Sequence, residues 1–267
     1  MTHLDLTPEH RAKTAALKAE KELYISLVLQ ITELTRTVKP NLEASYLLKI
    51  GSKKLELLNL QAEVSGLKFK MEILQAAINR KECVDLDAID ARIEEMLIAY
   101  YQKIQIESEQ LRAAQNRLSS LMSAEETAEI KKMYYALALK LHPDTNPEQT
   151  AEEMEMWHVV ASAYLLGDSQ TLKNLAAVVE NREPKSENIP DYDTAVREIE
   201  LFRLKNAGLL KKISEIKQEF PFTIAEKIED ETWITAENKA TVDQINLLNS
   251  TKEKYTDYIN IMLEMLT

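Results

Sequence analysis

The chain has 267 residues, enough for one or two domains, and a formal net charge of -11 at pH 7. This acidic balance argues against a general nucleic-acid binder, because binding to phosphates needs a clustered cationic face that the sequence lacks. The single cysteine, Cys83, excludes a disulfide framework within the chain. Only 4 glycines and 7 prolines are present, too few to punctuate strands joined by tight turns, so we predict an all-α protein.

The amino-terminal segment predicts a helix that begins at Thr7 as the N-cap, with Pro8 at the first helical position. Apolar residues then follow at spacings of three and four as far as Val38. We expect Pro40 to end this helix, because proline has no backbone N–H to donate, and Asn41 to cap the next helix.

Residues 41–122 predict a long antiparallel helical hairpin that resembles a coiled coil, and with the preceding helix they form a first domain, residues 1–122. The link near residues 81–84 is too short for anything but an antiparallel turn, and Asp85 caps the second helix. The first seam comprises Ile50, Leu57, Leu60, Val64, Leu67, Met71, Leu74 and Ile78. The second comprises Leu86, Ile89, Ile93, Met96, Tyr100, Ile104, Leu111, Ala114, Leu118 and Leu121. The alternative is pairing between chains, a homo-oligomer through the long helices.

A shorter helical hairpin is predicted in the centre of the chain. Its first helix, residues 125–141, has an apolar stripe made of Ile130, Tyr134, Leu137 and Leu141. Pro143 ends that helix because its ring disfavours helical geometry at His142. Pro147 suits the first turn of a second helix, whose stripe is Trp157, Val160, Ala161 and Tyr164. We expect the turn from His142 to Asp144 to project into solvent.

The remaining segments are also predicted to be helical. Gly167 marks a turn before a third helix, which completes a domain at residues 123–180. Residues 181–192 are polar, carry two prolines and predict a linker. Residues 193–267 then predict a helix ended by Pro221, a short helix from Thr223 to Trp233 and a last heptad-phased helix. With the amino-terminal helix, these helices are expected to complete a bundle around the long hairpin.

Both central helices and the turn between them fit a known sequence pattern. The residues that fit it are Ile130, Lys131, Lys132, Tyr134, Leu137, Ala138, Lys140, His142, Pro143, Asp144, Asn146, Pro147, Trp157, Val160, Ala163 and Tyr164. In these residues the chain resembles the J-domain (DnaJ) family of co-chaperones. It has neither a Gly/Phe-rich segment after the hairpin nor a cysteine-rich zinc module. It is therefore similar to the J-proteins that keep only the J-domain and attach it to segments of their own.

The resemblance implies a function as a co-chaperone. The ATPase domain of the major heat-shock chaperone would be contacted, and its ATP hydrolysis triggered, by His142, Pro143 and Asp144. Three lysines match family positions where a basic helix face meets an acidic surface of that partner, namely Lys131, Lys132 and Lys140. The protein itself would be no enzyme, and its long helices would bring the chaperone to a client protein that the sequence does not identify.

The sequence departs from the family pattern in two places. The usual short first helix, with its Tyr-Tyr/Phe-x-x-Leu-Gly pattern, is absent, and we infer that residues 117–122, the tail of the long hairpin, replace it and join the two parts rigidly. Tyr135 and Ala136 stand where the family commonly has Arg and often Lys. This loss of charge leaves a second interpretation open, a helical scaffold or adaptor that retains the J-like fold for packing.

The face that carries Tyr135 is also unusually apolar, because Ala136 and Leu139 share it. Clustered apolar residues more often mark a contact than a solvated surface. We predict that this face is covered by the long hairpin, by the carboxy-terminal helices or by a partner.

No catalytic, metal or cofactor site is predicted. None of the four histidines has Cys or carboxylate neighbours at metal-ligand spacing, and no glycine-rich phosphate loop is present. No window reaches the roughly 18 to 20 apolar residues of a membrane span, and the amino terminus has no apolar core of signal-peptide length. We therefore expect a cytoplasmic protein without a membrane or nucleic-acid partner.

Overall fold

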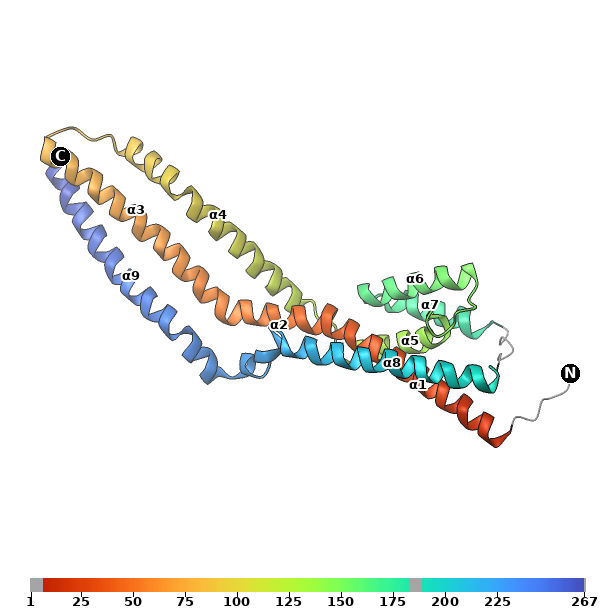
Figure 1. Cartoon of the computed structure of the whole chain (residues 1–267). Helices are drawn as coiled ribbons and strands as arrows, with labels where there is room; N and C mark the ends of the chain where they lie inside the picture. Colours follow the sequence, from red (N-terminus) through yellow and green to blue (C-terminus); the bar gives the residue numbers. More distant parts are fainter. Residues whose placement is uncertain (1–6, 183–188, 267) are drawn as a thin grey trace. The chain divides into compact units, whose positions relative to one another are not determined.

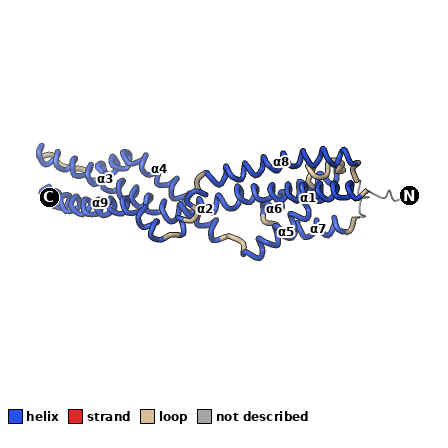
Figure 2. Tube along the Cα trace, turned by 60° about the horizontal axis from the view of Figure 1, so that its bottom comes forward, coloured by secondary structure: helices blue, strands red, loops and turns tan. Residues whose placement is uncertain are grey.

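The structure, a computed structural model, describes residues 7–182 and 189–266. Within these residues the chain forms helices joined by turns and contains no strand (Figure 1, Figure 2). The all-α prediction is therefore confirmed. Residues 183–188, in the middle of the predicted linker at 181–192, lie outside the described residues.

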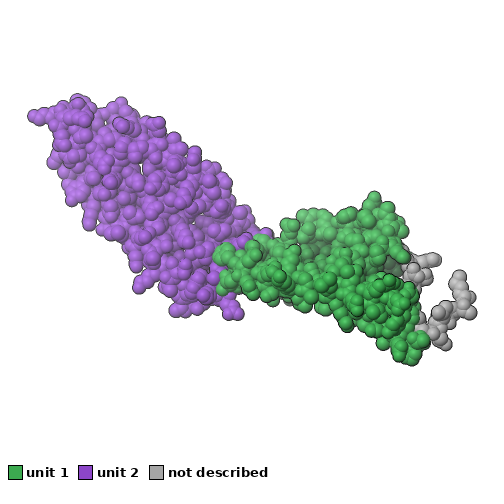
Figure 3. All heavy atoms as spheres, viewed as in Figure 1, with its two compact units in different colours: residues 1–40, 121–223 green, residues 41–120, 224–267 purple. Residues whose placement is uncertain are grey.

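The chain folds into two compact units, each assembled from two separate stretches (Figure 3). Unit 1 comprises Met1–Pro40 and Leu121–Thr223, and unit 2 comprises Asn41–Ser120 and Ile224–Thr267. This grouping differs from the consecutive segments that the sequence suggests. The reason is that the amino-terminal helix packs with the helix after the linker, whereas the last helix packs with the long hairpin.

The prediction that Pro40 ends the amino-terminal helix is wrong. The helix begins at the predicted N-cap, Thr7, but its path continues through a π-helical turn in which the Lys39 N–H bonds to the Leu34 carbonyl. A π-turn is wider by one residue, so it accommodates a proline that lacks an N–H and crowds the preceding turn. The elements along this path are α1 (Pro8–Glu33), η1 (Leu34–Val38), α2 (Lys39–Tyr46), η2 (Leu47–Gly51) and α3 (Ser52–Arg80).

Unit 2 contains the predicted long hairpin, formed within a single chain. Lys81 adopts a left-handed conformation (φ 56°) that ends α3, and Asp85 then caps α4 (Leu86–Ser119) by accepting hydrogen bonds from the Asp87 and Ala88 N–H groups. α3 and α4 run side by side in opposite directions. The antiparallel hairpin is therefore confirmed.

The apolar seam of α3 is shared between two neighbours. α9 (Glu231–Leu266) packs along α3 as well, so that within unit 2 α3 lies between α4 and α9 (Figure 1). The shared seam includes Leu60 and Val64 with Ile245 of α9, and Leu74 with Ile89 of α4 and Ile259 of α9. Heptad spacing thus identifies buried residues of α3 but assigns part of the seam to the wrong partner helix. In the second predicted seam Leu86, Met96 and Leu121 are exposed, whereas Leu97, which that seam omits, is buried.

Gly66 allows α3 and α4 to approach each other closely. A Cβ atom at this position would lie 3.2 Å from Leu97 Cδ1 and 3.3 Å from Ile93 Cγ2, tighter than ordinary van der Waals contact. The glycine lies in the middle of a helix, where it is less favourable than alanine by about 1 kcal/mol. Its packing role explains its presence there.

In unit 1, five helices from distant parts of the sequence surround one core. α1 and α8 pack lengthwise, and α5, α6 and α7 form the central hairpin and the helix after it. The most deeply buried residues, one from each helix, are Ile25, Ala138, Val160, Leu172 and Ala195. The bounds are α5 (Ala124–Leu141), α6 (Ala151–Leu166), α7 (Ser169–Glu180) and α8 (Tyr192–Gln218).

The inference that the tail of the long hairpin continues as a helix through residues 117–122 and joins the two parts rigidly is wrong. α4 ends at Ser119 and belongs to unit 2, whereas the central hairpin belongs to unit 1. The core of the hairpin is instead completed by α1 and α8, which contribute Leu17 and Phe202. Two helices outside the central segment therefore provide the missing packing surface.

The carboxy-terminal segment agrees with the prediction only in part. Pro221 follows the end of α8, as expected. The predicted short helix from Thr223 to Trp233 is replaced by two single 3-10 turns, and Trp233 lies in the first turn of α9. The turns are η3 (Phe222–Ile224) and η4 (Lys227–Glu229).

Candidate functional site

Capping boxes fix where the two helices of the central hairpin begin. Ser123 accepts a hydrogen bond from the Glu126 N–H, and the Glu126 carboxylate in turn accepts one from the Ser123 N–H. Thr150 and Glu153 form the same arrangement at the start of α6. α6 therefore begins after Thr150, later than the predicted position at Pro147.

Aromatic rings join the two helices behind the turn. The rings of Tyr134 on α5 and Tyr164 on α6 stack with their centroids 4.1 Å apart. The ring of Trp157 lies 5.8 Å from Tyr134 in a tilted arrangement. Such contacts add to the burial of apolar surface and hold the ends of the turn at a fixed separation.

The turn between the helices is held by its own hydrogen bonds. The His142 carbonyl accepts from the N–H groups of Thr145 at 3.1 Å and Asn146 at 3.0 Å. The Asn146 side-chain amide donates to the Leu139 carbonyl at 3.1 Å, and the Asp144 N–H donates to His142 Nδ1 at 3.1 Å. The His-Pro-Asp sequence therefore has a defined conformation.

His142 points inward, contrary to the prediction that the whole turn faces solvent. Only 12% of its side chain is exposed. Its ring lies between Trp157, with centroids 4.8 Å apart, and Tyr24 of α1, with centroids 5.7 Å apart. Pro143 and Asp144 are exposed, as predicted, so the expectation holds for two of the three residues.

The His142 imidazole is neutral at neutral pH. Burial lowers its pKa, the negative charge of Asp144 opposes this shift, and the positive charge of Lys205 adds to it, so the pKa lies below its ordinary value. Nδ1 accepts the backbone hydrogen bond from Asp144 and is therefore unprotonated. The 3.9 Å separation between His142 Nδ1 and Asp144 Oδ2 is thus no ion pair at neutral pH.

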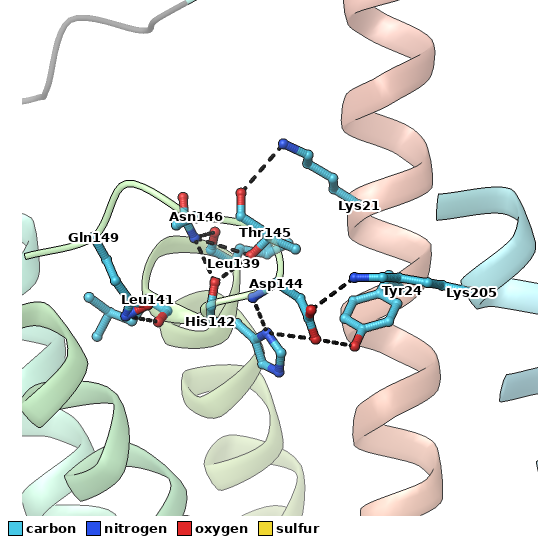
Figure 4. A network of polar contacts seen from close by, with 10 residues as sticks. All are labelled: Lys21, Tyr24, Leu139, Leu141, His142, Asp144, Thr145, Asn146, Gln149 and Lys205. Carbon is cyan, nitrogen blue, oxygen red and sulfur yellow. Dashed lines mark hydrogen bonds and ion pairs between the residues drawn. The ribbon is translucent and has the colours of Figure 1, made fainter. Parts of the chain in front are cut away.

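Both carboxylate oxygens of Asp144 are engaged by residues of the long helices of unit 1 (Figure 4). Oδ1 accepts a hydrogen bond from Lys205 Nζ of α8 at 2.8 Å, and Oδ2 accepts one from the Tyr24 hydroxyl of α1. Lys21 Nζ, one turn before Tyr24, donates to the Thr145 carbonyl at 3.4 Å. We call Lys21, Tyr24 and Lys205 the clasp.

The charges of the clasp favour an ionised Asp144. Burial raises the pKa of its carboxyl group, but the hydrogen bonds from Lys205 and Tyr24 and the charge of Lys205 outweigh burial, so the pKa lies below its ordinary value. Burial and the neighbouring carboxylate raise the pKa of the Tyr24 hydroxyl, which therefore remains a donor.

Contacts between α1 and α8 hold the clasp in position. The rings of Tyr24 and Phe202 meet edge to face with centroids 5.5 Å apart. Lys205 Nζ lies 5.4 Å from the Tyr24 ring centroid and 5.2 Å from that of Phe202, within the range of cation–π attraction. Lys21 Nζ forms an ion pair with Glu198 at 3.1 Å. The clasp is therefore ordered by its own helices and does not depend on Asp144 alone.

The three lysines of the predicted basic face have different environments. Lys131 forms an ion pair with Glu33 of α1. Lys132 and Lys140 are exposed. Two of the three predicted contact lysines are therefore accessible, and the third is engaged within unit 1.

The prediction that another part of the chain covers the face of Tyr135 is confirmed for Tyr135 itself. Its ring is half-buried, and its hydroxyl donates to the Glu22 carbonyl of α1 at 3.5 Å. The covering helix is α1, not the long hairpin or the carboxy-terminal helices that we expected. Lys132 and Ala136 on the same face are exposed.

Residues 118–174 match the family model of the DnaJ domain. The chain contains a DnaJ domain. No curated protein and no solved structure matches the chain. The match runs from the end of α4 through α5, the His-Pro-Asp turn and α6 to the middle of α7. It excludes α1 and α8. The clasp residues thus come from helices outside the matched DnaJ domain.

Sequence reasoning missed the clasp because no local pattern marks it. Tyr24 belongs to the apolar stripe of its helix and looks like any other core aromatic residue. Lys205 is one of many lysines on amphipathic helices, and 61 residues separate it from Asp144. The replacement of a cationic residue by Tyr135, next to Tyr134, is the sign in the sequence that another helix covers the DnaJ domain.

Other kinds of site find no support in the part of the chain that the structure describes. Residues 7–182 and 189–266 contain no group of three or more His, Cys, Asp or Glu side chains placed to hold a metal ion. Among the described helices, none combines the length and the apolar character needed to cross a membrane.

Proposed function

We propose that the protein is a J-domain co-chaperone. In this proposal the His-Pro-Asp turn of the DnaJ domain contacts the ATPase domain of a major heat-shock chaperone and stimulates ATP hydrolysis there, while the protein itself is no enzyme. The observation that carries the proposal is the match of residues 118–174 to the DnaJ domain with His142, Pro143 and Asp144 in the turn between its two helices.

Exposed residues around the turn supply the contact surface for the chaperone in this proposal. Pro143 and Asp144 are exposed at the turn, and Lys132 and Lys140 are exposed on α5. His142 orders the turn from inside, because its carbonyl and ring nitrogen accept three backbone hydrogen bonds. The long helices of unit 2 then serve to bring the chaperone to a client protein.

Single-turnover ATP hydrolysis by a heat-shock chaperone tests the proposal. The full chain should accelerate hydrolysis, and Asp144→Asn should abolish the acceleration, because the turn then lacks its negative charge. Glu148→Gln is the matched control, since it removes an exposed carboxylate a few residues away and should leave the acceleration unchanged. Equal acceleration by the parent and Asp144→Asn would contradict the proposal.

A scaffold that keeps the DnaJ fold for packing is the second candidate. The observation that favours it is the burial of His142 between Trp157 and Tyr24, which gives part of the His-Pro-Asp turn a structural role. A pure scaffold predicts that His142→Gln lowers thermal stability and that no variant of the chain accelerates ATP hydrolysis.

A further inference from the structure

The carboxylate of Asp144 is occupied within the chain. Each of its oxygens accepts one hydrogen bond from the clasp, from Lys205 Nζ at 2.8 Å and from the Tyr24 hydroxyl. Each oxygen retains lone pairs for a further donor, so a cation of a partner protein competes with Lys205 for the negative charge of the carboxylate and for the space around it. Charge-assisted hydrogen bonds of this kind are stronger than neutral ones, so the competition affects affinity.

α1 also contacts the DnaJ domain beside the turn. Lys21 donates to the Thr145 carbonyl, Lys131 of α5 pairs with Glu33, and the Tyr135 hydroxyl donates to the Glu22 carbonyl. These contacts extend from the turn along α5. In the proposed function, the chaperone contacts the same turn and, on α5, the exposed residues Lys132 and Lys140 beside these contacts. α1 therefore lies on part of the surface that the chaperone needs.

The polar contacts of the clasp are of a kind that can separate. The side chains of Asp144 and Lys205 are 40% and 33% exposed, so water can replace their mutual contact. α1 packs against α8 over a longer stretch than against α5. α1 and α8 can therefore remain paired while the clasp releases Asp144.

We propose that the clasp is an autoinhibitory contact. Lys21, Tyr24 and Lys205 hold the His-Pro-Asp turn in a state that stimulates the chaperone weakly, and release of Asp144 from the clasp produces the active state. The inference rests on the proposed function, because it assumes that the turn acts on a chaperone. In this proposal α1 and α8 control the matched DnaJ domain, although both helices lie outside it.

The double variant Tyr24→Phe/Lys205→Gln opens the clasp with little change elsewhere. Phe keeps the buried ring of residue 24 in the core, and Gln keeps a polar side chain of similar length on the surface of α8. In single-turnover ATP hydrolysis with a heat-shock chaperone, the concentration of the full chain at half-maximal acceleration should fall by about tenfold, equivalent to about 1.4 kcal/mol. The control Tyr258→Phe/Lys212→Gln changes an exposed tyrosine and an exposed lysine outside the clasp and should leave this concentration unchanged.

Asp144→Asn in the opened background shows whether the gain acts through the turn. It should remove the acceleration altogether. If the parent and the opened variant accelerate hydrolysis at the same concentrations, autoinhibition is refuted while the proposed function stands. If the opened variant gains activity that Asp144→Asn does not remove, the inference also fails, because the gain then arises elsewhere.

Hydrogen exchange of the chain without chaperone provides a readout that does not depend on the proposed function. The N–H groups of Thr145 and Asn146, which bond to the His142 carbonyl, should exchange faster in the opened variant than in the parent. Unchanged exchange would refute the clasp as a constraint on the turn. Faster exchange with no acceleration by parent or opened variant would overturn both the proposed function and its autoinhibition, leaving only a structural contact.

Discussion

Units 1 and 2 are both helical, but different contacts matter in each. In unit 2, apolar side chains meet along α3, as where Val64 packs against Ile245 of α9. In unit 1, an apolar core lies beside a polar contact, where Asp144 binds Tyr24 and Lys205. Opening an apolar seam exposes it to water, whereas water solvates the separated groups of a polar contact. By this reasoning, opening the seam of α3 costs more free energy than separating Asp144 from Tyr24 and Lys205.

The largest effect is expected from a charge in the seam of unit 2. Val64→Asp places a carboxylate between α3 and α9, where only 9% of the valine is exposed, and should lower the free energy of unfolding by about 3 kcal/mol or more. Denaturant unfolding of the full chain measures this loss. Glu63→Gln, next to it on the exposed side of α3, should cost at most about 1 kcal/mol. Similar losses in the two variants would refute the assigned seam.

Two glycines, Gly66 in unit 2 and Gly208 in unit 1, have different surroundings. Gly66→Val forces a side chain against Leu97 and Ile93 and should destabilise the protein by about 1 to 3 kcal/mol. A Cβ atom added to Gly208 in α8 would meet no atom within 4 Å, so Gly208→Ala should stabilise by about 0.5 to 1 kcal/mol through helix propensity alone. Thermal unfolding of both variants beside the parent should therefore show shifts of opposite sign. A stabilising Gly66→Val would mean that α3 and α4 are not closely packed.

Tyr135→Arg tests the contact of α1 with α5. The change replaces a half-buried ring by a charge and should lower the free energy of unfolding by about 1 kcal/mol. Ala136→Arg introduces the same charge one residue later at an exposed position and should stay within about 0.5 kcal/mol of the parent. Thermal melting of the two variants distinguishes them, and identical midpoints would show that α1 does not cover Tyr135.

The smallest expected effect is a pH dependence that comes from His142. Because its pKa in the folded protein is lowered, the neutral ring contributes stability that is fully present above the unfolded pKa of about 6.5 and is lost as the pH falls through the folded pKa. The slope for one proton is at most about 1.4 kcal/mol per pH unit. Denaturant unfolding between neutral and mildly acidic pH should show this loss in the parent. His142→Gln should have a flatter profile, and equal slopes would mean that the ring is not buried in its neutral form.

Local sequence patterns predicted most helices because each pattern has a direct physical cause. Asp85 caps α4, and the spacing from Ile130 to Leu141 places one face of α5 in the core, both as predicted. The predicted helix end at Pro40 was wrong because a π-turn accommodates the proline, and nothing in the surrounding residues indicates that turn. Heptad spacing likewise marked Val64 as buried without revealing that α9 buries it.

Only those residues of the functional site that are neighbours in the sequence could be predicted. His142, Pro143 and Asp144 are neighbours in the chain, and their flanking helices carry the DnaJ pattern. The groups that bind Asp144 depend on how distant helices pack, and Tyr24 lies 120 residues away. Lys131 shows the same dependence on distant helices. Its position in the DnaJ pattern predicts a chaperone contact, but its side chain forms an ion pair with Glu33 of α1.

The hydrogen bonds within the His-Pro-Asp turn have a consequence for the strength of binding. The His142 carbonyl and Nδ1 restrain the backbone from Asp144 to Asn146 through hydrogen bonds that lie within the turn itself, separate from the side-chain bonds that Lys205 and Tyr24 make to Asp144. A binding loop that is already partly ordered loses less conformational entropy when a partner docks. Loss of the Nδ1 acceptor in His142→Gln should therefore weaken association chiefly through entropy, a difference that calorimetry at several temperatures can resolve.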